Sequence, residues 1–186
     1  MKKLVLTCLL AAGTLACGSV AATAAANFNS TADQTLGIGA AVSFENTQFV
    51  HKVILESNKQ TIQFYKHGFY SVSYSVTGSL ATPGVGAWSV GLYHNGNLVN
   101  VSGAIASNAG DVLTTGATVM LHANKWDILE LKSTTTANIL LSGAVAGNDD
   151  SSVRNLSANI TLVKIEEESI DEDKLPEPLC LPVTGN

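Results

Sequence analysis

An alternation of apolar and small polar residues runs through residues 68–76, which read GFYSVSYSV. Successive side chains of a β-strand point to opposite faces, so this pattern predicts a strand with one apolar face. The apolar face consists of Tyr70, Val72, Tyr74 and Val76, and the other face of Phe69, Ser71, Ser73 and Ser75. The serine face is covered by water, by another sheet or by another copy of the chain, and that choice bears on whether the protein assembles.

Similar short apolar runs follow one another through residues 40–165, separated by turn sequences such as SLATPGVG, HNGN and GNDDSS. No apolar stretch outside residues 1–26 has the 3.6-residue period of an amphipathic helix over a helical length. Asn95 and Gly96 suit a two-residue hairpin turn, in which both residues need a positive φ. The pattern therefore predicts an all-β sandwich or barrel. The predicted strands are 41–44, 52–55, 61–65, 69–76, 87–94, 97–101, 112–121, 127–133, 139–145 and 156–165.

Residues 1–26 have the three parts of a secretory signal peptide. Lys2 and Lys3 precede an apolar run, and the segment ends in small residues that permit cleavage after Ala24 or after Ala26. Glycines interrupt the apolar run, which disfavours the alternative of an uncleaved membrane anchor, and no later stretch reaches the roughly 18 apolar residues of a span. The mature protein is expected to be secreted, at the cell surface or elsewhere outside the cell, or in the periplasm.

The chain has three cysteines, of which Cys8 and Cys17 lie inside the predicted signal. An alternative to cleavage is lipid attachment at Cys17, but in TLAC the leucine precedes the cysteine by two residues, whereas bacterial lipoprotein signals place it three before. Removal of the signal leaves Cys180 alone. A single cysteine cannot form an intrachain disulfide, so Cys180 is a candidate for an intermolecular one.

The charge of the chain is concentrated at its C-terminus. Residues 166–186 hold seven acids and one lysine, a net charge of −6, together with three of the four prolines, whereas residues 27–165 hold eight acids against seven Lys or Arg, a net of −1. A segment of that composition is expected to be a disordered acidic tail. The near-neutral remainder has no basic stripe, which makes nucleic acid a poor partner.

These boundaries predict four regions: a signal peptide at 1–26, a linker at 27–39, a jelly-roll domain at 40–165 and the tail at 166–186. Within the tail, residues 181–185 read LPVTG, which resembles a sortase sorting signal. A sorting signal continues into an apolar span and basic residues, and here one residue follows, so the match is expected to reflect chance or a shortened chain.

The last predicted strand, LSANITLVKI, is apolar on both faces. One face holds Leu156, Ala158, Ile160 and Leu162, and the other Val163 and Ile165. A two-layer sandwich buries only one face of each sheet, so the outer face of this strand is expected to be covered as well. In a domain of this size the simplest cover is another subunit.

Residues 68–74, GFYSVSY, resemble the G-x-Y-x-hydrophobic-x-Y strand of the complement globular-head and tumour necrosis factor superfamily. The hairpin LYHNGNLV and the strands DVLTTGATVML, DILELKS and SANITLVKI follow in the order that this family has. The chain is similar above all to the bacterial branch that caps collagen-like surface and exosporium glycoproteins. The resemblance covers residues 40–165 and implies a ten-strand jelly roll of two antiparallel sheets, assembled as a homotrimer.

The chain departs from the family at one turn. The family often carries Gly-Asp before the strand that corresponds to DILELKS, and this chain has Asn124-Lys125-Trp126-Asp127, in which only Asp127 matches. Trp126 is a candidate binding-loop residue that could stack on a sugar or a protein partner, because loops often carry binding residues. The alternative is that its ring folds back and closes one end of the sandwich.

Candidate trimer-interface residues are Ser71, Ser73, Val163 and Ile165, with solvent exposure of the serine row as the alternative. No G-x-S-x-G motif is present, and His51, His67, His94 and His122 lack the spacing of a metal site. Asn148, Asp149 and Asp150 are weak calcium candidates, because calcium takes six to eight oxygens and their loop offers fewer. No cofactor is expected.

The sequence thus predicts a non-enzymatic, secreted or surface-displayed trimeric binding or structural module that recognises a protein or glycan partner. Two alternatives belong to other classes. One is a hydrolase on a jelly-roll scaffold, which needs histidine and carboxylate side chains in one cleft. The other is the receptor-binding head of a phage or virion fibre, against which the signal peptide argues.

Overall fold

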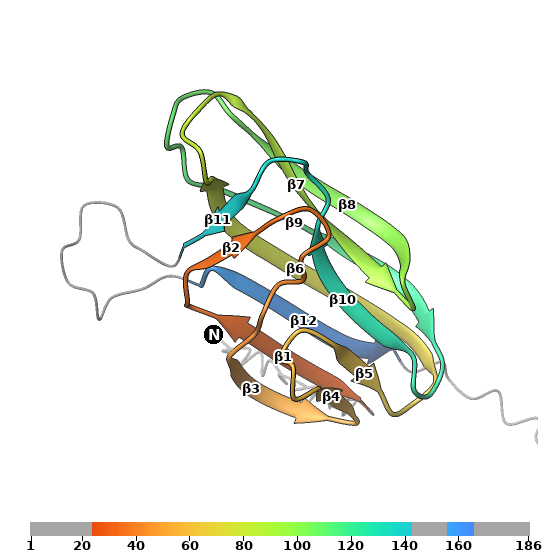
Figure 1. Cartoon of the computed structure of the whole chain (residues 1–186). Helices are drawn as coiled ribbons and strands as arrows, with labels where there is room; N and C mark the ends of the chain where they lie inside the picture. The colour runs from red at the N-terminus through yellow and green to blue at the C-terminus, as the bar shows by residue number, and fades with distance from the viewer. Residues whose placement is uncertain (1–23, 143–155, 166–186) are drawn as a thin grey trace, which may run out of the picture.

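The computed structural model describes residues 24–142 and 156–165, which form two packed antiparallel sheets (Figure 1). The described residues contain no helix, and so none that could cross a membrane. The first sheet has seven strands in the order β2-β11-β6-β12-β1-β3, with β9 paired to the other edge of β6. Its strands are β1 (Ala25–Ser30), β2 (Gln34–Leu36), β3 (Asn46–His51), β6 (Gly68–Leu80), β9 (Leu113–Ala123), β11 (Ile139–Leu141) and β12 (Ala158–Ile165).

The second sheet has five strands in the order β4-β5-β10-β7-β8. Its strands are β4 (Val53–Leu55), β5 (Ile62–Phe64), β7 (Gly86–His94), β8 (Asn97–Ala106) and β10 (Ile128–Ser133). Asn95 and Gly96 join β7 to β8 with φ angles of 49° and 78°, which confirms the predicted hairpin turn. The two sheets face each other, and the strands other than the exposed edge strand β3 contribute side chains to a shared core.

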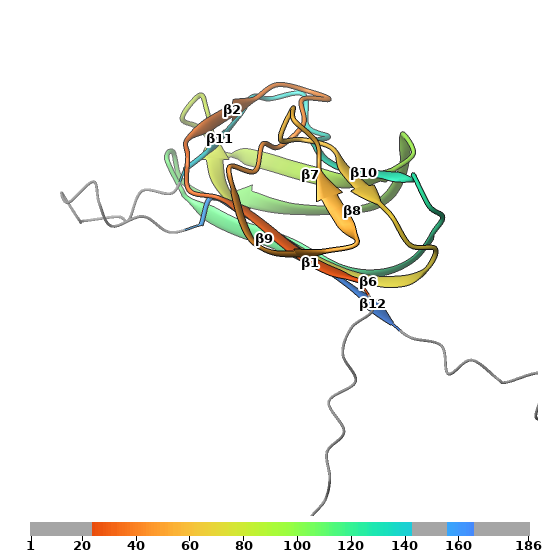
Figure 2. The same cartoon turned by 90° about the horizontal axis from the view of Figure 1, so that it is seen from below.

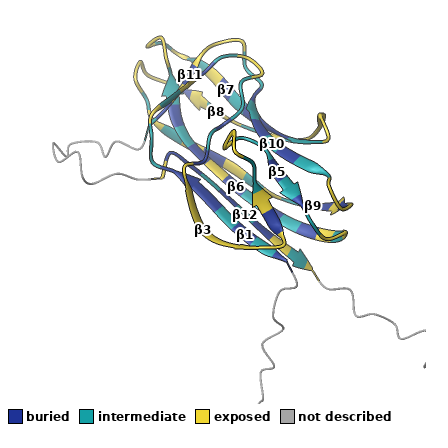
Figure 3. Ribbon diagram, turned by 60° about the horizontal axis from the view of Figure 1, so that its bottom comes forward, coloured by how far each residue is buried: buried dark blue, intermediate teal, exposed yellow. Residues whose placement is uncertain are grey.

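The core confirms the alternation in residues 68–76. Tyr70, Val72, Tyr74 and Val76 are buried, and the serines between them are partly or fully exposed. Buried and exposed residues alternate in bands along the strands of the first sheet (Figure 3). The largest fully buried side chains, Trp88, Tyr70, Phe28, Phe44 and Phe64, come from both sheets and their connections. Burial of side chains of this size supplies most of the free energy that holds the sheets together.

Nine of the ten predicted strands correspond to β4 through β12. The prediction for residues 41–44 is wrong, because this segment forms only an isolated bridge between Ala41 and Lys132. Val42 and Phe44 are nevertheless buried, and their backbone N–H groups donate to the carbonyls of Leu131 and Lys59. Buried and partly exposed side chains alternate in this segment as in a strand, because Val42 and Phe44 fill the core. The segment is not a strand of either sheet, because its backbone hydrogen bonds go to two separate partners.

The N-terminal boundary differs from the prediction. Residues 27–39, expected to be a linker, contain most of β1 and all of β2, so the jelly roll extends to the N-terminal side of residue 40. β1 lies between β12 and β3, with Ala26 opposite Leu162, and Phe28 is 1% exposed. The sequence AANFNS does not predict this strand, because alanine and asparagine have low β-propensity and only one residue is large and apolar.

Candidate functional site

The seven-stranded sheet leaves one broad face turned away from the core, which we call the open face. It is formed by β3, β1, β12, β6 and β9, and the strand register aligns their outward side chains in rows. One row is His51, Ala25, Val163, Ser71 and Met120; the next is Phe49, Asn27, Thr161, Ser73 and Thr118; a third contains Asn29, Asn159, Ser75 and Gly116. The face therefore brings together segments that are far apart in the sequence.

The middle of the open face is polar, and its groups bond to one another. The Asn27 side-chain amide donates to Asn159 Oδ1 at 2.8 Å and to Thr161 Oγ1 at 2.7 Å. The hydroxyls of Ser73 and Thr118 are 2.8 Å apart. Ser73, Thr118, Asn159 and Thr161 border a shallow pocket of about 310 Å³. Because the polar atoms already have partners, covering this region with another chain would leave few of them unsatisfied.

One end of the open face is apolar. Phe69, Met120, Val163 and Ile165 are 41%, 58%, 38% and 41% exposed. Val163 lies opposite Ser71, which lies opposite Met120, and Ile165 lies opposite Phe69. Contiguous exposed apolar side chains of this kind mark interaction surfaces. We call these four residues the apolar patch.

The open face contains all four predicted interface residues, Ser71, Ser73, Val163 and Ile165. Ser71 lies between Val163 and Met120 in its row. The sequence alone did not identify Met120 or Asn27 as members. Met120 lies on a strand with mixed polarity, and Asn27 lies in the segment predicted to be a linker. Only the register between strands shows that both residues belong to the open face.

Trp126 projects from the turn between β9 and β10. Its side chain is 52% exposed, which places it on the surface and not in the sandwich interior. The indole lies edge-on to the Tyr65 ring at a centroid distance of 4.6 Å, and Lys125 Nζ is 4.6 Å from the indole centroid. Its φ is 76°, a conformation that glycine adopts easily and a bulky residue does not. Trp126 thus takes a backbone conformation that suits glycine better than a bulky side chain.

Asp127 fixes this turn to the hairpin between β7 and β8. One carboxylate oxygen accepts the Asn124 backbone N–H at 2.7 Å and lies 3.0 Å from His94 Nε2, and the other accepts the Asn95 amide at 2.8 Å. Burial raises the pKa of Asp127, but the hydrogen bonds from Asn124 and Asn95 and the positive charge of His94 outweigh it, so the pKa is lowered. The ionised carboxylate therefore holds two turns together.

A second shallow pocket, of about 330 Å³, lies beside Tyr65 and is lined by that ring and by residues 50–54. Tyr65 connects it to Trp126 through the ring contact described above. Val50 and Ile54 are 50% and 41% exposed in it, next to His51 and Lys52. An aromatic and aliphatic surface beside a lysine suits contact with a sugar ring or with an apolar side chain of an acidic partner.

No group of three or more His, Cys, Asp or Glu side chains gathers within residues 24–142 and 156–165. His94 is held by Asp127, and His51, His67 and His122 are exposed at separate positions around one end of the domain. The calcium candidates Asn148, Asp149 and Asp150, and the disulfide candidate Cys180, lie outside the described residues. The calcium site and the intermolecular disulfide therefore stay predictions.

No family model and no curated protein sequence matches the chain. The fold is similar to that of the Eiger TNF from S. frugiperda, with a TM-score of 0.60, 13% identity, and coverage of 79% of this chain and 95% of that one. It is also similar to the globular domain of the zebrafish complement 1qA protein, with a TM-score of 0.56, 12% identity, and coverage of 77% and 98%. At these identities the comparisons show the fold, which is a jelly roll as the sequence resemblance implied. The described residues form twelve strands and not the predicted ten, because β1 and β2 precede the predicted domain and β3 forms an exposed edge.

Proposed function

We propose that the protein is a secreted or surface-displayed homotrimeric binding module, similar to the heads that cap bacterial collagen-like surface glycoproteins, and that it has no catalytic role. The observation that carries the proposal is the open face, on which an apolar patch adjoins rows of mutually bonded polar side chains. A solvated face of an antiparallel sheet needs no such patch. A face that packs on copies of itself does, because apolar burial drives association.

The proposed number of copies rests on the sequence resemblance. The resemblance to the complement globular-head and tumour necrosis factor superfamily implies three subunits arranged around this sheet. The small serine, threonine and alanine side chains of β6 and β9 support that arrangement, since they permit close approach of neighbouring chains. The apolar patch at one end would then be buried by its equivalents in the other two subunits.

Export is supported by the sequence of residues 1–26. β1 begins at Ala25, so cleavage after Ala24 leaves the strand whole, whereas cleavage after Ala26 removes two residues that pair with Val163 and Leu162. We therefore place cleavage after Ala24. N-terminal sequencing of the exported protein should begin at Ala25, and a start at Asn27 would contradict this placement.

The ligand site is proposed at the Trp126 turn. Its exposed indole, the neighbouring Tyr65 ring and the pocket at residues 50–54 form a single surface that could recognise a glycan or a protein segment. A glycan array and a surface-protein array, each probed with the wild-type protein and with W126A, test this. We expect the bound signal to fall with W126A, and an unchanged signal would remove Trp126 from the site.

Sedimentation equilibrium tests the assembly directly. The exported protein at micromolar concentration should have three times the mass of one subunit, and the ratio should persist on dilution within that range. A mass equal to one subunit would contradict the proposal, and a mass of two subunits would retain self-association but reject the trimer.

A further inference from the structure

The turn between β7 and β8 contains the only Asn-Gly pair of the sequence, Asn95-Gly96. Both residues are exposed, and their φ angles are 49° and 78°. The turn belongs to the five-stranded layer of the sandwich, and β6, β9 and β12 belong to the other layer (Figure 2). The pair is chemically reactive, because the Asn95 side-chain amide is followed by a backbone nitrogen that no Cβ shields.

The reaction open to such a pair is deamidation. The Gly96 backbone nitrogen attacks Asn95 Cγ and forms a new C–N bond, and Nδ2 leaves as ammonia with the proton that the Gly96 nitrogen loses. Water then opens the five-membered succinimide ring. Cleavage of the ring bond to Cγ yields aspartate, and cleavage of the ring bond to the backbone carbonyl yields isoaspartate. Water is the co-reactant in both cases, so the step needs no cofactor.

The fold places both ends of the Asn95 amide in contact with the turn before β10. Nδ2 donates to Asp127 Oδ1 at 2.8 Å, and Oδ1 accepts the Ile128 backbone N–H at 2.9 Å. Because Nδ2 is the leaving group, the reaction must break its hydrogen bond to Asp127. The Ile128 N–H faces the oxygen on which negative charge develops, so it stabilises the intermediate. Asp127 therefore restrains the reaction that the Ile128 N–H favours.

Other groups hold the Asp127 carboxylate in the position that restrains Nδ2. Its second oxygen accepts the Asn124 backbone N–H at 2.7 Å and lies 3.0 Å from His94 Nε2. A hydrogen bond to a charged acceptor is stronger than one between neutral groups. The contact between Nδ2 and Asp127 is therefore the main barrier that the described residues raise against deamidation.

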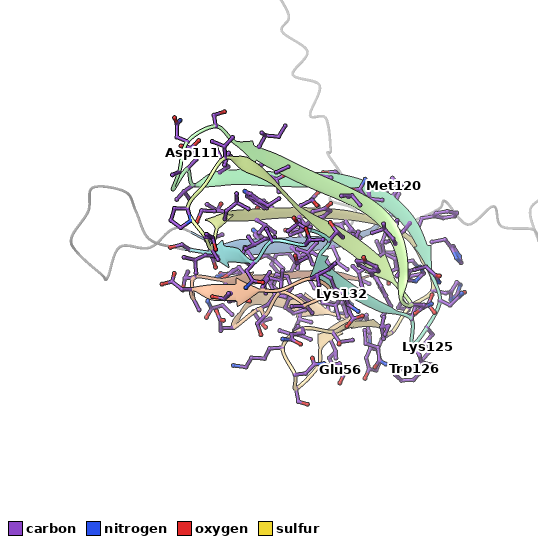
Figure 4. The ribbon with its side chains drawn as sticks, turned by 45° about the horizontal axis from the view of Figure 1, so that its top comes forward. Glu56, Asp111, Met120, Lys125, Trp126 and Lys132 are labelled. Atoms are coloured by element: carbon purple, nitrogen blue, oxygen red, sulfur yellow. The ribbon has the colours of Figure 1, made fainter. Side chains whose placement is uncertain are left out.

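Loss of the Asn95 amide removes the donor that joins the two turns. A carboxylate at this position has no N–H to donate to Asp127, and it places a second negative charge beside the first. Isoaspartate also adds one backbone carbon to a two-residue turn. Either product separates the hairpin from the turn of Trp126, which lies with Lys125 at one end of the molecule, whereas Asp111 lies at the other (Figure 4).

We propose that Asn95 is a deamidation site of the folded protein, that Asp127 slows its reaction, and that the product loosens the turn of Trp126. The modification is irreversible and takes place within one subunit, so it needs neither the trimer nor a ligand. As the protein ages, the fraction of molecules with an ordered Trp126 turn falls. Only the effect of this loss on ligand binding rests on the proposed function.

Peptide mass spectrometry of the full chain, sampled over time at mildly alkaline pH, tests the site. Asn97 and Asn108 are internal controls, because both are exposed but are followed by leucine and alanine, whose side chains shield the next backbone nitrogen. We expect the mass gain of NH₂ replaced by OH to accumulate at Asn95 well before it does at either control. Equal rates at Asn95 and Asn97 would overturn the proposal.

A pair of variants tests the restraint by Asp127. D127N should raise the rate at Asn95 about fivefold, which corresponds to the difference of about 1 kcal/mol between a charge-assisted and a neutral hydrogen bond. V76A is the control for general destabilisation, because Val76 is buried on β6 of the other sheet. It should leave the rate at Asn95 unchanged. A D127N rate equal to that of wild type, or an equal rise in V76A, would overturn the restraint.

Hydrogen exchange of the Asn124 backbone N–H, which Asp127 accepts, tests the loosening of the turn. N95D reproduces the aspartate product. N97D adds the same charge at an exposed residue of the same hairpin, whose side-chain amide donates to the Asn95 carbonyl instead of to Asp127. We expect exchange about tenfold faster in N95D than in N97D, the effect of one charge-assisted hydrogen bond. Equal exchange would contradict the loosening. None of these measurements uses the trimer or a ligand, so their outcome is independent of the proposed function.

Discussion

At the scale of single residues, the turn between β9 and β10 combines strain with strong hydrogen bonding. Trp126 has a φ of 76°, which glycine would adopt at no steric cost. Asp127 holds that conformation by accepting hydrogen bonds from Asn124 and Asn95, which tie the turn to the neighbouring hairpin. The backbone strain at Trp126 costs some stability, although its side chain is 52% exposed and contributes little to the core. Such strained residues are common at binding surfaces.

A pair of substitutions at Trp126 separates the backbone strain from the ring contacts. W126A and W126G both remove the indole and its contact with Tyr65, and they differ in the ease with which the residue adopts a positive φ. We expect W126G to be more stable than W126A by about 1 kcal/mol. Urea denaturation of both variants measures the difference, and equal free energies of unfolding would show that the turn relaxes when the ring is removed.

The lowered pKa of Asp127 predicts a pH dependence. A carboxylate whose folded-state pKa is depressed contributes stability that is complete above its unfolded pKa of about 3.9 and is lost as the pH falls through the folded value. D127N should cost about 1–3 kcal/mol at pH 7, because it weakens charge-assisted bonds in a partly buried site. The deficit relative to wild type should shrink below about pH 4. A deficit that stays constant from pH 7 to pH 3 would contradict the assignment.

At the scale of elements, β1 shows where the domain begins. It lies between β12 and β3, and its inward residues Ala26 and Phe28 are buried in the common core. A chain that lacks β1 would expose the edge of β12 along its length and leave a cavity where Phe28 packs. Loss of a buried phenylalanine alone costs about 3–5 kcal/mol, a large part of the stability of a domain of this size.

Two shortened chains test this boundary. A chain of residues 25–165, which begins at the proposed cleavage site, should fold cooperatively, whereas a chain of residues 40–165, the boundary that the sequence predicted, should fail to do so. Circular dichroism and thermal melting distinguish them. Cooperative melting of the shorter chain at the same temperature would show that β1 and β2 are dispensable.

The sequence predicted strands that carry several large apolar side chains and missed strands that carry few of them. β6, β7 and β12 carry large apolar side chains at every second position, so the presence of these strands and the face that each buries could be predicted. β1 is built from small and amide side chains, and all six residues of the edge strand β3 are exposed, so neither has an apolar pattern to read. The members of the open face on β9 and β1 depend on which strands are neighbours, and that pairing is non-local information.

At the scale of the whole molecule, charge and assembly are arranged separately. The open face, with its apolar patch, belongs to the seven-stranded sheet, and Ala25 pairs with Val163 where the described part of that sheet begins and ends. Three subunits packed on their open faces would each carry the net charge of −6 of residues 166–186 directly after β12 in the sequence.

Removal of the tail should leave the fold and the assembly intact. The tail holds seven acids and three prolines among its residues 166–186, so it cannot bury enough apolar surface to offset the cost of ordering its backbone. A chain truncated after Ile165 should melt at an unchanged temperature at physiological salt and have the trimer mass less that of the tails. Melting well below the full chain would mean that the tail packs on the domain and contributes to its core.

The claim that the open face is the assembly surface is tested most directly by two variants, each of which replaces one exposed valine with aspartate. Val163 is 38% exposed on the open face, and Val101 is 48% exposed on β8 of the other sheet. Sedimentation velocity of V163D and V101D at micromolar concentration, with circular dichroism to verify the fold of each, makes the comparison. The account predicts a folded monomer for V163D and an unchanged trimer for V101D. A trimeric V163D, or a V101D that dissociates equally, would contradict it.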